Sequence, residues 1–303
     1  MTTTLDWYGC TTFRLRTAGL TIFLDAYIDR VPDAAGSGRS AADISECDWI
    51  LVGHSHFDHL FGAEVIAATT GARVVASYET VRVLEALGVP SERMICVAGG
   101  ETVDLGNGVR ATAYPSIHSC VWADDSSAET DQACLGDLGL SHQEQQARFA
   151  EMMADLMGSM ASAAVEHVMT SLSAHSPRGD GGALLFHIET PDGSVLFQDT
   201  SGHWSGVVDL LRPDVAIVAA AGRANIDGEP IQGSLAEFVA DHVRRLQPRQ
   251  VVLGHHDDWL PGFSSPADVG AIRAALGVAA PGAELLELGY VDGTELFDPT
   301  VTA

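Results

Sequence analysis

A dense run of metal-binding side chains follows directly after a short apolar segment. Residues 49–52 are apolar and predict a buried strand, and His54, His56, Asp58 and His59 come immediately after it. Histidines two residues apart in an extended turn project together, so the first two can share one metal ion and the next two can face a second. Three of the chain's 12 histidines in one such window are poorly explained by chance. Imidazole and carboxylate donors suit zinc, manganese or iron, so the sequence predicts a metal centre at a strand end.

Charge excludes several classes of partner. The chain has 303 residues with 41 acidic and 16 basic side chains, all of the latter arginines, so its formal net charge is −25. Nucleic acids and anionic membranes require a basic surface, and we expect neither as a partner. Apolar residues make up 46% and charged residues 19%, a globular composition.

Cysteine usage and the N-terminus predict a cytoplasmic protein. The N-terminus lacks the pattern of a secretory leader, and the longest apolar stretch, near residues 215–221, is too short to span a membrane. Five widely spaced cysteines do not form the pattern of a disulfide framework. They are Cys10, Cys47, Cys96, Cys120 and Cys134.

Alternating strand and helix patterns predict an α/β fold. In the first half we expect strands at residues 6–17, 20–26, 49–52, 73–76 and 109–114, and helices at 63–69 and 80–87. In the second half we expect strands at 183–189, 194–198, 215–219 and 250–253, helices at 234–246 and 267–276, and a C-terminal strand pair.

Residues 119–182 depart from this alternation of strands and helices and predict a helical insertion. Ser141 and Glu144 form a capping box, and apolar residues recur at three- and four-residue steps as far as Leu172. A stripe of that length must be buried, so we expect the helix to cover the metal site or to join two subunits. Packing on its own sandwich as ordinary core is the alternative.

The H-x-H-x-D-H pattern after a strand resembles the metallo-β-lactamase fold superfamily. The resemblance implies one αββα sandwich domain over residues 1–303, and it is closest to the branch that contains ascorbate-phosphate lactonase and related metal-dependent hydrolases. Residues 7–13 and 20–25 are similar to the first two strands of that branch. Cys10 stands where the branch often has histidine.

This resemblance also implies three further metal ligands. His118 completes the set of His54 and His56, Asp199 bridges both ions, and His255 completes the set of Asp58 and His59. We choose His255 over its neighbour His256 because members of the branch tend to carry an aromatic residue four positions after this ligand, and Trp259 stands there. The expected cofactors are two divalent ions, zinc first, with manganese or iron as alternatives.

These ligands predict hydrolysis by a metal-bound hydroxide, with Asp58 orienting it. His203 and Asp258 are candidate proton donors, with a supporting role behind the ligands or an ordinary surface position as the other interpretation. Arg223 is a candidate for holding an anionic substrate group, with an ordinary surface position as the alternative.

We expect a small ester, lactone or related molecule as substrate. A small-molecule phosphodiesterase of the same fold, a mononuclear iron dioxygenase acting on a persulfide, and a metal-free binding relative remain alternatives. We also expect a homo-oligomer formed through residues 141–172.

Overall fold

Side chains on the two faces of each central strand enter different layers of the protein. In β3 (Leu20–Leu24), Ile22 lies in the apolar core between two sheets, whereas Phe23 faces the outer helices. In β10 (Ser194–Gln198), Phe197 lies in the same central core and Leu196 faces the helices on the opposite side. Side chains alternate along a strand, so strands that are apolar on both faces are covered on both. The expected αββα sandwich is confirmed. The computed structural model describes residues 2–120, 141–173, 182–231 and 233–297.

The first sheet is built from the N-terminal part of the chain and closed by a strand from the C-terminal end. Its order is β17-β1-β2-β3-β4-β5-β6. β3, β4, β5 and β6 run parallel, while β1, β2 and β17 are antiparallel to their neighbours. Besides β3, the strands are β1 (Thr4–Gly9), β2 (Thr12–Thr17), β4 (Trp49–Leu51), β5 (Arg73–Ala76), β6 (Met94–Cys96) and β17 (Thr294–Glu295).

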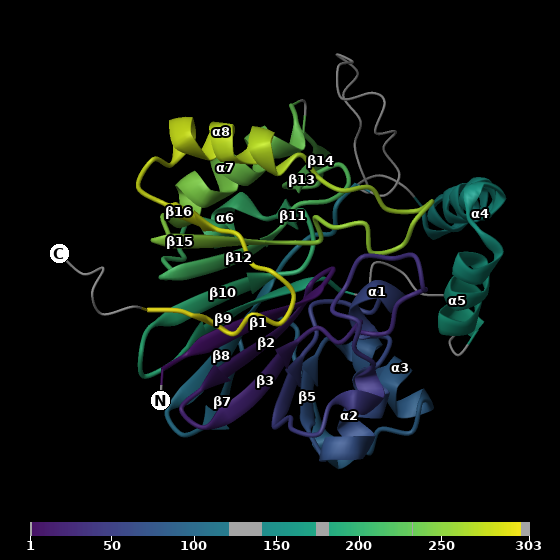
Figure 1. Ribbon diagram of the computed structural model, residues 1–303, viewed down its shortest axis with the longest axis horizontal. Helices are drawn as coiled ribbons and strands as arrows, with labels where there is room; N and C mark the ends of the chain where they lie inside the picture. Colours follow the sequence, from purple (N-terminus) through teal and green to yellow (C-terminus); the bar gives the residue numbers. More distant parts are fainter. Residues whose placement is uncertain (1, 121–140, 174–181, 232, 298–303) are drawn as a thin grey trace.

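The second sheet has the order β16-β15-β12-β10-β9-β8-β7 and faces the first (Figure 1). β10, β12, β15 and β16 run parallel. Besides β10, its strands are β7 (Thr102–Gly106), β8 (Val109–Pro115), β9 (Leu184–Glu189), β12 (Val215–Ala219), β15 (Gln250–Gly254) and β16 (Glu284–Leu286). A small third sheet contains β11 (Gly202–His203), β13 (Asn225–Ile226) and β14 (Glu229–Pro230).

Helices cover both outer faces of the sandwich. The first sheet carries α1 (Phe57–Leu60), α2 (Ala63–Thr70) and α3 (Tyr78–Ala86), with short 3₁₀ turns η1 (Ala41–Asp43) and η2 (Ser91–Arg93). The second sheet carries α6 (Ser205–Val208), α7 (Leu235–Leu246) and α8 (Val269–Ala279). Helices α4 (His142–Ser159) and α5 (Ser162–Ser173) lie together at one end of the sandwich (Figure 1).

Three expected elements differ in the structure. The run expected at residues 6–17 is two strands, because the chain turns back at Gly9 and Cys10, both of which have positive φ. The expected single helix at 141–172 is two helices, α4 and α5, and the break follows Gly158 and Ser159, which are poor helix formers. The expected C-terminal strand pair is wrong as well, because β16 joins the second sheet and β17 the first.

Helix α5 packs on the body of its own chain. Ala164 and Val168 are buried in an apolar cluster with Tyr27, Phe57 and Trp259. The buried apolar residues of α5 therefore form part of the core at this end of the sandwich, next to α1. The oligomer expected through residues 141–172 stays a prediction.

No helix in the described part of the chain combines the length and the apolar character that a membrane span requires.

Candidate metal centre

Segments that follow several strands meet at the end of the sandwich nearest α4 and α5 (Figure 1). His54 and His56 follow β4, and Asp58 and His59 lie in the short helix α1. His118 follows β8, Asp199 follows β10 and His255 follows β15. Residues placed beyond strand ends are held by a rigid base, which suits a metal site.

The side chains form three groups, each able to hold a metal ion. Within each group the donor atoms all lie within 4.8 Å of one another. The first group is His54, His56 and His118; the second is His54, His59 and Asp199; the third is Cys10, Asp58 and His255. All seven ligands expected from the sequence are thus brought together. Two features differ from the expectation: Cys10 joins Asp58 and His255, and His59 is grouped with His54 and Asp199 and not with Asp58 and His255.

His54 and Asp199 each have a buried polar atom that a bound cation would satisfy. His54 Nδ1 lies 2.6 Å from Asp199 Oδ2, and both side chains are fully buried. In the part of the chain that the structure describes, His54 Nε2 and Asp199 Oδ1 have no hydrogen-bond partner. An unsatisfied buried polar atom costs about 1–3 kcal/mol, and a bound metal ion removes this cost. The donor set therefore fits a metal centre.

Gly53 makes the approach of Asp199 possible. A Cβ atom at position 53 would lie 2.0 Å from Asp199 Oδ2 and 2.7 Å from its Oδ1. Any larger residue must displace this carboxylate from His54.

We therefore expect Gly53→Ala to lower metal affinity by about 10–100-fold, the range typical of disturbed ligand support. Metal content after dialysis against a series of free zinc concentrations measures the effect. Gly277→Ala is the matched control, because position 277 lies in α8 with open space around it. Equal zinc affinity in both variants would contradict this account of Gly53.

Asp25 and Thr11 orient His59. Asp25 Oδ2 lies 2.7 Å from His59 Nδ1, and Thr11 Oγ1 lies 3.0 Å from the same nitrogen. His59 Nε2 is left facing Asp58, 3.5 Å from its Oδ2. Asp25 is a residue of the site that the sequence motif does not include. The sequence offers one indication of this role, because Asp25 directly follows β3. β3 runs parallel to β4, so both strands end at the same edge of the sheet.

Burial and neighbouring charges set the protonation of the donors. Burial, with the nearby imidazoles of His59 and His118, lowers the pKa of His54 well below its usual value. Burial opposes ionisation of Asp58, but the imidazoles of His59 and His255 outweigh it and lower the pKa of Asp58 well below its usual value. Neutral imidazole and anionic carboxylate are the forms that bind metals.

The neighbouring residues His255 and His256 point to different places. His255 Nε2 lies 3.2 Å from Asp58 Oδ2, and Trp259 packs edge-on against the His255 ring at 5.2 Å. His256 instead stacks on Trp7 with ring centroids 4.5 Å apart. His255 thus joins the donor group of Asp58, whereas His256 is directed to Trp7.

The two candidate proton donors do not join the donor groups. His203 is buried against α7, where its ring lies 5.5 Å from Phe238 and 4.4 Å from His242. Asp258 accepts a hydrogen bond from Ser264 Oγ at 2.8 Å. The contacts of His203 hold it in the apolar layer under α7, and its role as a proton donor stays a prediction. Asp258 is placed as a support for the turn after β15.

Arg223 is buried, which corrects the alternative of a surface position. Its Nη2 donates to the carbonyl of Ile231 at 3.3 Å, and its own carbonyl accepts from Cys120 N at 2.8 Å. The residue thus lies beside the segment that follows His118. Its expected contact with substrate stays a prediction.

The buried pair of His203 and His242 predicts acid sensitivity of the fold. Burial lowers the pKa of His203 to about 4 and that of His242 well below its usual value. Between pH 6.5 and 4 the unfolded chain binds protons that the folded chain excludes, so stability is full above pH 6.5 and falls as the pH drops. His203 alone accounts for about 3 kcal/mol over this window.

Urea unfolding of the metal-free protein across this pH range tests the effect. We expect a double variant, His203→Phe with His242→Leu, to lose less stability on acidification than the wild type. His142→Gln is the control, because His142 is exposed at the start of α4. An identical pH dependence in the double variant and the wild type would refute the assignment.

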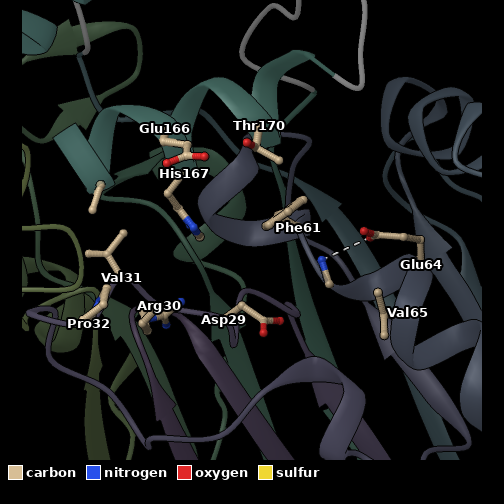
Figure 2. Close-up of a pocket in the computed structure, with 12 residues that line it drawn as sticks. Asp29, Arg30, Val31, Pro32, Phe61, Glu64, Val65, Glu166, His167 and Thr170 are labelled. Atoms are coloured by element: carbon tan, nitrogen blue, oxygen red, sulfur yellow. Dashed lines mark hydrogen bonds between the residues drawn. The ribbon is translucent and has the colours of Figure 1, made fainter.

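A cavity of about 440 Å³ lies between α5 and the segment around α1 and α2. Figure 2 shows His167 pointing from α5 into this space, across from Arg30. None of the metal-ligand candidates lines the cavity. The buried ring of Tyr27 contacts His167 on one side and Trp259 on the other, and Trp259 contacts His255. The cavity is therefore separate from the metal donors.

Sequence comparison finds relatives over part of the chain. Residues 21–138 match the family model of the beta-lactamase superfamily domain. A UPF0173 metal-dependent hydrolase from Pyrobaculum calidifontis is 31% identical over 115 residues, which cover 38% of this chain and 50% of the relative. The chain spans about half the length of the curated relatives it matches first.

Structural comparison extends the likeness to nearly the whole chain. Igni18, a metallo hydrolase from Ignicoccus hospitalis, matches with a TM-score of 0.62 at 16% identity, over 98% of this chain and 99% of that one. CmlA, a diiron beta-hydroxylase from Streptomyces venezuelae, matches with a TM-score of 0.59 at 17% identity, over 97% of this chain and 54% of that one. At these identities the likeness concerns the fold. Together with the domain match over residues 21–138, it shows that the chain has the metallo-β-lactamase fold.

Proposed function

We propose that the protein is a metal-dependent hydrolase with a dinuclear centre that acts on a small ester, lactone or related molecule. One observation carries the proposal. Three donor groups lie at one strand edge, two of them sharing His54, and His54 Nε2 and Asp199 Oδ1 are buried there without a partner among the described residues. The name of the Pyrobaculum relative, a metal-dependent hydrolase, supports the same reaction class.

The residues divide between two ions. His54, His56 and His118 would hold the first, and Asp58 and His255 would contribute to the second. Asp199 and His59 lie between these sets, with His59 Nδ1 3.3 Å from Asp199 Oδ2. Two bound divalent ions supply a water molecule acidic enough to react near neutral pH and positive charge for the oxyanion that develops.

Asp58 is the residue suited to direct that water. It is almost fully buried, and the imidazoles of His59 and His255 on either side favour its anionic form. An anionic carboxylate can accept a hydrogen bond from the attacking water and hold it toward the substrate. Asp25 and Thr11 keep the ring of His59 fixed, so that the position of Asp58 relative to the other donors is maintained.

Exposure and charge support a small substrate. His56, His118 and His255 are half-buried, whereas His54, His59 and Asp199 are buried, so substrate would approach from the side of the half-buried imidazoles. The net charge of −25 disfavours a polyanionic substrate. We therefore place uncharged esters and lactones ahead of phosphodiesters.

A substrate panel tests the reaction class. The chelator-treated protein and the same protein reloaded with zinc, manganese or iron are assayed with lactones, thioesters and phosphodiesters. We expect turnover of a lactone or ester that disappears on chelation and returns with metal. Metal-dependent turnover of phosphodiesters alone would replace the proposed substrate class. Metal binding without hydrolysis of any of these compounds would contradict the proposed function.

A further inference from the structure

Cys10 lies at the metal centre and not merely in the core near it. It occupies the tight turn between β1 and β2 and is fully buried. Its Sγ, one carboxylate oxygen of Asp58 and one ring nitrogen of His255 all lie within 4.8 Å of one another. The thiol points to the α1 segment, where it lies 3.6 Å from the backbone carbonyl of Asp58. A sulfur, an oxygen and a nitrogen donor therefore converge on one point.

The backbone around Cys10 is held in place by several contacts. Trp7 Nε1 donates to the Cys10 carbonyl at 3.0 Å, and His255 N donates to the same carbonyl at 2.8 Å. Asp257 accepts the hydrogen bond of Cys10 N at 3.0 Å. These contacts join the turn that carries Cys10 to the segment that carries His255.

Both joined residues have an unusual backbone conformation. Cys10 has φ +50° and His255 has φ +61°, in the left-handed region that residues other than glycine seldom adopt. Such conformations persist where surrounding contacts hold them, and they cluster at functional sites. Here they direct the thiol and the imidazole toward the same carboxylate.

A second buried cysteine shows that burial alone does not produce this arrangement. Cys47 is also buried and free, but its thiol donates to the carbonyl of Trp49 at 3.2 Å. It belongs to none of the three donor groups. The position of Cys10 therefore reflects the site and not a general property of buried cysteines in this chain.

We infer that Cys10 is a thiolate ligand of the second metal ion, together with Asp58 and His255. The inference rests on the proposed function for the presence of that ion. On binding, the thiol proton is released to solvent and the sulfur bonds to the metal. A thiolate beside an imidazole and a carboxylate favours zinc, cobalt or iron over manganese and magnesium at this site. The two sites then differ in chemistry, because the first group, His54, His56 and His118, contains no sulfur donor.

Cobalt substitution tests this inference by spectroscopy, independently of activity. We expect the wild-type protein loaded with two equivalents of Co²⁺ to show a near-ultraviolet sulfur-to-cobalt charge-transfer band. Cys10→Ser should lack the band and bind the second ion about 10–100-fold more weakly or worse, the loss that even outer ligand contacts produce. Cys47→Ser is the matched control and should keep the band.

A further variant and an X-ray absorption measurement complete the test. Cys10→His replaces the sulfur by a nitrogen donor, and we expect it to bind two cobalt ions without the band. In the zinc-loaded wild type, X-ray absorption at the zinc edge should show a sulfur neighbour at about 2.3 Å. Two bound cobalt ions without a band in the wild type, or a band that survives in Cys10→Ser, would overturn the role of Cys10 alone. Failure to bind cobalt at all would instead contradict the metal centre and the proposed function.

Discussion

Replacing His56 or Asp58 by alanine should abolish hydrolysis and lower the amount of bound metal. Each substitution removes a donor from one of the two sites, His56 from the first and Asp58 from the second. Loss of Asp58 also leaves His59 Nε2 and His255 Nε2 without the carboxylate that faces both. We expect at least a 10³-fold loss of turnover, in the range for removal of a group that acts directly on the reaction.

Metal content and turnover of the purified variants measure this effect. His142→Ala is the control, because His142 is exposed at the start of α4 and belongs to no donor group. Unfolding midpoints establish that each variant is folded. Full turnover with unchanged metal content in either His56→Ala or Asp58→Ala would be incompatible with the assigned ligands.

Docking of helix α5 should contribute strongly to stability at the metal-bearing end. Val168 is 1% exposed and lies in the cluster of Tyr27, Phe57 and Trp259, whereas the next residue, Met169, is 47% exposed. Val168→Asp places a carboxylate among buried rings without a partner, which costs about 2–5 kcal/mol. Met169→Asp adds the same charge on the exposed face and should change stability by no more than about 0.5 kcal/mol.

The same pair of variants also tests whether α5 supports the site. Trp259 contacts both this cluster and the ring of His255. We therefore expect Val168→Asp to weaken binding of the second metal ion, while Met169→Asp binds as the wild type does. Urea unfolding and zinc titration of both variants give the two readings. Equal stability of the two variants would show that α5 is not part of the core.

The layered fold was predictable because its central strands are apolar on both faces. The segments at 49–52, 73–76, 215–219 and 250–253 carry near-continuous apolar residues, which only a strand covered on both faces accommodates. Strands and helices that alternate along the chain then favour parallel pairing. The sharp turn at Cys10 was not predictable in this way, because its flanking residues read as one extended run.

The metal donors were predictable where they form a local motif. His54, His56, Asp58 and His59 lie within six residues of one another, so the sequence itself places them together. His118, Asp199 and His255 depended on the family resemblance, since the sequence alone does not give the distance between strand ends. The positions of Cys10 and His203 could not be predicted from the sequence. Contacts with residues distant in the chain, such as His255 and Phe238, decide where each side chain points.

The break between α4 and α5 has a similar cause. The apolar repeat continues past Gly158 and Ser159, so periodicity favours one long helix. Ser159 Oγ instead contacts the carbonyl of Gly262, and Met160 packs in the same cluster as Phe263. Tertiary contacts at the turn after β15 therefore compete with helix continuation and end α4 there.

Anomalous diffraction from crystals of the zinc-loaded protein locates the bound ions. We expect two peaks at the zinc edge. One should lie among His54, His56 and His118, and the other beside Asp58 and His255. A single peak, or zinc bound only outside these donors, would contradict the dinuclear centre.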